Sequence, residues 1–155
     1  MKRADQEYAV QLYTWRLRDY AESAQFRRMA QRIHRYTESA DYIEWANLLC
    51  SIALVETNER RLLIRGVEWT FHVLAFGRSG LTLGPFQLRN SPWKLSSAIE
   101  RLILLARRRQ IGPELADLNL SNFAKLWYGH DFVETGSALS YPAALKIAAS
   151  VVATP

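Results

Sequence analysis

The run SIALVE at residues 51–56 decides how this chain folds, because it places a carboxylate after an uninterrupted apolar segment. It closes a longer stretch, residues 39–56, that is apolar over much of a helical circumference. That pattern predicts the buried central helix of the fold, with Ser39 as its N-cap. Burial disfavours a charged carboxylate, so the pKa of Glu56 is expected to rise toward the range of a general acid. The alternative is a structural Glu56 paired with Arg60 or Arg61.

A second segment, GLTLGPFQL at residues 80–88, is extended and punctuated by glycine and proline. Residues 81–88 are the best strand candidate in the chain, although Pro85 restricts them to an edge strand or a loop. Glycines here would let backbone N–H and C=O groups approach a polymeric substrate closely. The polar residues 57–61 end the apolar pattern between the two segments.

The order of Glu56, GPFQ at 84–87, WYG at 127–129 and Tyr141 resembles the motifs of the lysozyme-like superfamily. Its lytic transglycosylases and muramidases carry a catalytic Glu, a Gly-Leu-Met-Gln-type run, a Tyr-Asn-Gly-type turn and a last helix containing Tyr. The resemblance implies a mainly α, lysozyme-like domain with a small β-hairpin or extended loop. It also implies an enzyme that cleaves peptidoglycan glycan strands, with Glu56 as general acid/base.

The same resemblance implies a substrate cleft whose lining residues are Thr82, Gly84, Phe86, Gln87 and Tyr128. Thr82 and Gln87 would contact the N-acetyl group or orient the catalytic carboxyl, and Tyr128 would close the cleft. The alternatives are that Thr82 and Gln87 satisfy the backbone of a hairpin, and that Tyr128 packs in the core.

A second branch with the same fold is the peptidoglycan glycosyltransferase domain of penicillin-binding proteins. Residues 56–69 are similar to its Glu-Asp-x-x-Phe-x-x-His-x-Gly motif, and GLTL at 80–83 is similar to its Gly-x-Ser-Thr-Ile opening. Thr57 replaces the motif Asp, the motif His is absent, and Ser96 and Ser97 stand where Arg-Lys would bind phosphate. A domain acting on a lipid-linked precursor, active or degenerate, is therefore the first alternative.

The candidates for a second carboxylate are Glu59, Glu68 and Glu100, of which Glu59 and Glu68 read more simply as surface charges. Glycosidases with two carboxylates hold them about 5–5.5 Å apart when retaining and about 6.5–9.5 Å apart when inverting. Lytic transglycosylases, as a family, use one Glu and let the 6-hydroxyl of the substrate attack. A single clear Glu suits that branch best.

The composition describes one ordinary globular domain of 155 residues with a net charge of +5. A basic surface suits an acidic polymer such as peptidoglycan with its peptide carboxylates, or is simply a solubility charge. The second alternative is therefore a non-enzymatic helical module for an acidic partner, although no nucleic-acid module is recognisable. Three dispersed histidines and a single cysteine, Cys50, predict no metal site and no cofactor.

Glycine and proline punctuate only the second part of the chain. No glycine or proline occurs before Gly66, so residues 1–65 should be almost continuously helical, with a break at 22–23 and a turn at 37–40. Further helices should begin at Ser96 or Ser97, at Ser121 and at Ser140, the last reaching Val152. We expect a single domain, 1–155, in which residues 1–38 form a helical extension and 39–152 form the core.

The sequence shows no secretory signal and no apolar run of the roughly 18 residues that a membrane-spanning helix needs. We therefore expect synthesis in the cytoplasm and action in the periplasm or cell wall after non-classical export. That route would serve an antibacterial, bacteriolytic enzyme, with a secretion apparatus or an immunity protein as further partners.

Overall fold

The computed structural model describes residues 3–59, 70, 74, 82–83, 86, 88–89, 94–128 and 139–153. The described chain is mainly helical, which confirms the mainly α part of the predicted fold. Its helices are α1 (Arg3–Ala21), α2 (Ala24–Ser39), the short 3₁₀ helix η1 (Ile43–Trp45), α3 (Ala46–Glu59), α5 (Leu95–Arg108), α6 (Asp117–Tyr128) and α7 (Tyr141–Val152).

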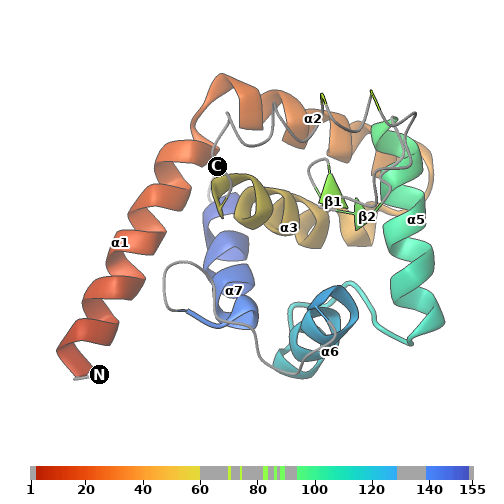
Figure 1. Ribbon diagram of the computed structural model, residues 1–155. Coiled ribbons are helices and arrows are strands. Elements are labelled where there is room, and N and C mark those ends of the chain that lie inside the picture. The colour runs from red at the N-terminus through yellow and green to blue at the C-terminus, as the bar shows by residue number, and fades with distance from the viewer. Residues whose placement is uncertain are drawn as a thin grey trace.

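Helix α3 lies at the centre of this arrangement, as its apolar sequence predicts. Every residue from 48 to 55 is at most 1% exposed. Figure 1 shows α3 enclosed by α1, α2 and α7, and α3 contacts each of these three helices. Because apolar area removed from water stabilises a fold by about 25 cal/mol per Å², this buried helix contributes a large share of the hydrophobic stabilisation.

The two N-terminal helices, which we predicted as an extension, contribute to the same core. Tyr13 and Leu17 of α1 and Phe26 and Ile33 of α2 are buried in one cluster with α3. The break between α1 and α2 falls at the predicted place, where the Ser23 hydroxyl accepts a hydrogen bond from the N–H of Phe26 at 3.1 Å. An N-cap of this kind contributes about 1 kcal/mol to helix stability.

The predicted turn at residues 37–40, with Ser39 as an N-cap, is wrong. Helix α2 continues through Ser39, whose hydroxyl donates to the carbonyl of Tyr36. The chain turns instead at Asp41, which has a φ of 59°. Asp tolerates this left-handed conformation better than most residues because its short polar side chain can bond locally. Helix α3 therefore starts at Ala46 and ends at Glu59, three residues beyond Glu56.

Two further helix starts are also wrong. Helix α5 has Lys94 as its N-cap, so Ser96 and Ser97 lie inside the first turn. Helix α6 begins at Asp117, and Ser121 is an interior residue. In both cases the serine pattern places the start too late, and at α5 the reason is that an N-cap without a capping side chain leaves no signal in the sequence.

Helix α7 begins where predicted, with Ser140 as N-cap, and its hydroxyl accepts a hydrogen bond from the N–H of Ala143 at 3.3 Å. Pro142 occupies the first turn, where its missing N–H costs nothing. Between α3 and α5, the two-residue strands β1 (Thr82–Leu83) and β2 (Leu88–Arg89) pair antiparallel, with Thr82 opposite Arg89.

Candidate active site

Glu56 is a buried acidic residue within the apolar centre of the molecule. Its exposed fraction is 5%, and the preceding residues Leu54 and Val55 are fully buried. Thr57 is equally buried, and its hydroxyl donates back to the carbonyl of Ala53 within α3. A carboxyl group in such surroundings requires hydrogen bonds, because burying a polar group without them costs several kcal/mol.

The hydroxyl of Tyr141 provides one of these hydrogen bonds, donating to Oε1 of Glu56 at 2.7 Å. Tyr141 is 1% exposed and is the first residue of α7, the helix that packs most extensively on α3. The two residues are 85 positions apart in the sequence. The Ser140 cap and Pro142 fix the start of α7, and the start of α7 in turn fixes the position of the phenol.

This arrangement holds a carboxyl group in one orientation in a mostly apolar environment. A hydrogen bond from a neutral phenol restricts the rotation of the carboxyl group without removing its capacity to gain or lose a proton. A fixed orientation is one property that a general acid/base needs, together with a matched pKa and hydrogen-bond reach of the substrate.

The other predicted cleft residues are described only in part. Thr82 lies in β1, and the ring of Phe86 is fully buried in the same core cluster as α3. Gly84 and Gln87 lie outside the described residues. Tyr128 is the last residue of α6, and the position of its side chain also lies outside the description. The hydroxyl that contacts Glu56 comes from Tyr141, which the motif order included without assigning it a role.

The structure places one of the three candidates for a second carboxylate. Glu100 is exposed on α5, and one of its oxygens accepts a hydrogen bond from the hydroxyl of Tyr36 on α2. This hydrogen bond, together with burial, raises the pKa of Tyr36 to about 12. The backbone of Glu59 ends α3, but its side chain and all of Glu68 lie outside the described residues.

Neither a metal cluster nor a membrane helix is found in the described part of the chain. No three His, Cys, Asp or Glu side chains there are grouped to hold a metal ion. No helix in the described ranges is long and apolar enough to cross a bilayer. Comparison with protein-family models, with curated proteins and with solved structures finds no match to this chain.

Proposed function

We propose that this protein cleaves the glycan strands of peptidoglycan between N-acetylmuramic acid and N-acetylglucosamine, with Glu56 as general acid/base. One observation carries the proposal: a carboxyl group buried in the central helix accepts a hydrogen bond from a tyrosine at the start of the last described helix. The motif order of the lysozyme-like superfamily places a catalytic Glu and a late Tyr in this sequence order.

The proposed reaction needs a single carboxyl group. Protonated Glu56 donates its proton to the glycosidic oxygen while the bond from that oxygen to the anomeric carbon breaks. The resulting carboxylate then accepts a proton from the attacking hydroxyl group, which belongs to water in hydrolysis or to the 6-hydroxyl of the sugar in 1,6-anhydro formation. Glu56 ends the cycle protonated, so no further acid or base is consumed.

In this scheme Tyr141 is a positioning residue that fixes Oε1 of Glu56. Thr82, Gly84 and Gln87 would bind the sugar, consistent with the predicted glycine-lined segment. The Tyr141→Phe variant should lower kcat with little effect on KM and should shift the pH dependence of kcat. If Tyr141 served only to stabilise the fold, Tyr141→Phe would leave kcat, KM and the pH dependence of kcat of the folded protein unchanged.

The test is the release of soluble muropeptides from isolated sacculi by the purified protein. Glu56→Gln should lower the rate by about 10²–10⁴-fold, the usual contribution of a general acid/base. Glu44→Gln is the matched control, because the side chain of Glu44 is 47% exposed and pairs with Arg107 at 3.7 Å. Wild-type protein that releases nothing, or a Glu56→Gln variant as fast as the control, would overturn the proposal.

Two further measurements separate the related reactions. Mass analysis of the released muropeptides distinguishes hydrolysis from 1,6-anhydro formation. Conversion of a labelled lipid-linked precursor to polymer, without release from sacculi, would instead assign the transferase branch.

A further inference from the structure

A basic pocket of about 540 Å³ lies between the C-terminal half of α2 and the start of α5, well removed in sequence from Glu56. Its positive charge comes from two separate segments, because two arginines belong to α2 and a lysine directly precedes α5. The described lining residues include no carboxylate; they are Arg32, Arg35, Tyr36, Ser39, Lys94, Leu95 and Ser96.

The three cations have side chains available to a ligand. Arg32 and Arg35 are three residues apart and therefore project from the same side of α2. Both are exposed, as is Lys94, and none of the three forms an ion pair with another residue in the described ranges. Like charges held around one pocket repel each other, and a bound anion would relieve that repulsion.

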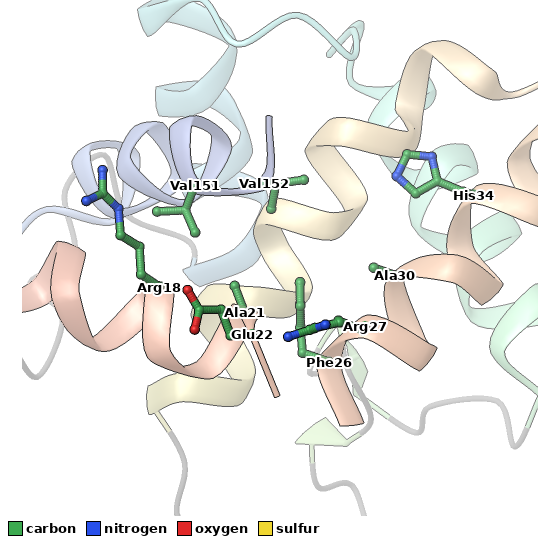
Figure 2. A pocket seen from close by; sticks show the side chains of 9 residues that line it. All are labelled: Arg18, Ala21, Glu22, Phe26, Arg27, Ala30, His34, Val151 and Val152. Atoms are coloured by element: carbon green, nitrogen blue, oxygen red, sulfur yellow. The ribbon is translucent and has the colours of Figure 1, made fainter. Parts of the chain in front are cut away.

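Two other hollows along α2 differ from this pocket in their charge. In the pocket between α1, α2 and α7, Glu22 accompanies Arg18 and Arg27, and Figure 2 shows its carboxylate between these two arginines. In the hollow that Arg27 and Arg35 line, Glu38 is present. The α2–α5 pocket alone among these three combines several cations with no described acidic lining residue.

The remaining polar groups of the pocket suit an anion with several oxygens. The hydroxyl of Tyr36 adds no donor for an anion, because it already donates to Glu100, which lies outside the lining. Ser96 contributes a hydroxyl group. Lys94 caps α5 without a side-chain hydrogen bond, so the first N–H groups of that helix add donors beside the cations.

From the pocket and its three cations we propose that this site binds the phosphate group of a phosphate ester. Two arginine forks can each form paired hydrogen bonds with phosphate oxygens, and a lysine adds a point charge. A phosphate dianion neutralises more of the three positive charges than one carboxylate does. The site is separate from Glu56, and it stands whether or not the protein cleaves glycans.

The test is titration of the full chain with inorganic phosphate, followed by isothermal calorimetry and by NMR shifts, at low salt and at matched ionic strength in chloride. A dissociation constant of about 1 mM or tighter is expected. The Arg32→Gln/Arg35→Gln/Lys94→Gln variant should weaken binding by tenfold or more. The Arg32→Lys/Arg35→Lys variant, which keeps the charge and removes the forks, should give an intermediate loss.

The matched control is Arg28→Gln/Arg108→Gln/Arg109→Gln, which removes the same charge from three exposed arginines outside the pocket. It should bind phosphate within twofold of the wild type. If phosphate binding weakened equally in both triple variants, and circular dichroism showed that both are folded, the proposed site would be refuted.

A parallel arm uses vesicles of phosphatidylcholine with and without phosphatidylglycerol to identify the source of the phosphate. Binding to the anionic vesicles that the pocket variant loses and the control keeps would place the phosphate on a lipid headgroup. Phosphate binding without vesicle binding would indicate a soluble ester. Absence of both would refute the proposal.

Discussion

Removing the Tyr141 hydroxyl tests the central pair of this fold most directly. Tyr141→Phe keeps the buried ring, which is 1% exposed, and deletes only the oxygen that donates to Glu56 at 2.7 Å. A typical hydrogen bond contributes about 0.5–1.5 kcal/mol, and removing the donor from a buried acceptor costs about 1–3 kcal/mol. The free energy of unfolding at pH 7 should therefore fall by about 2 kcal/mol.

A double-mutant cycle isolates the pair from the other contacts of both residues. In a Glu56→Leu background the hydroxyl has lost this acceptor, so Tyr141→Phe should become nearly neutral or stabilising. The coupling free energy should be about 1–3 kcal/mol. Urea unfolding followed by circular dichroism measures it: with a slope of about 2 kcal/mol per M, Tyr141→Phe alone should lower the midpoint by about 1 M.

The control for this cycle is Tyr42→Phe. Tyr42 is half-buried and its ring lies beneath Arg107, 5.1 Å from the guanidinium carbon, a contact that phenylalanine preserves. This change should leave the free energy of unfolding within about 0.5 kcal/mol of the wild type. A Tyr141→Phe effect as small as that of the control, in both backgrounds, would refute the hydrogen bond as a stabilising contact.

The remaining predictions concern a thiol, a phenol and a helix cap. Cys50 is fully buried and burial raises its pKa to about 12, so a thiol reagent at pH 8 should modify it only as fast as the protein unfolds. Reaction as fast as that of a free thiol would contradict this burial. The raised pKa of Tyr36, from 10.0 to about 12, stabilises the folded state fully below pH 10, and this stabilisation is lost as pH rises through 12. The difference in stability between wild type and Tyr36→Phe should shrink over that range, and a constant difference would exclude the contribution of Glu100. Ser140→Ala removes the acceptor for the N–H of Ala143 and should lower the free energy of unfolding by about 1 kcal/mol, measured by urea unfolding. Ser150→Ala, at an exposed site late in the same helix, serves as its reference.

The sequence predicts the centre of this fold well because burial leaves a strong pattern. Residues 48–55 are apolar apart from Ser51, and all of them are buried. The burial of the Glu56 carboxyl group follows from its position directly after these residues on the same helix. The start of α7 is equally clear, because Ser140 and Pro142 are strong local signals for a helix N-terminus.

Features that depend on a single backbone angle or on a distant contact could not be predicted. The turn at Asp41 needs a positive φ that Asp adopts only in some contexts, so the sequence pattern favours Ser39 as the boundary between the two helices. Lys94 caps α5 without a side-chain bond and leaves no pattern to read. The contact between Glu56 and Tyr141 spans 85 residues, so only the packing of α7 on α3 reveals it.

The 85-residue separation between Glu56 and Tyr141 also affects the nascent chain during synthesis. A ribosome adds about 5–20 residues per second, so Tyr141 is synthesised several seconds after Glu56, its hydrogen-bond partner. During this interval the apolar surface of α3 that α7 later covers has no partner from that helix. Nascent chains arrested before residue 141 should therefore recruit chaperones, and release should coincide with emergence of the last described helix from the exit tunnel.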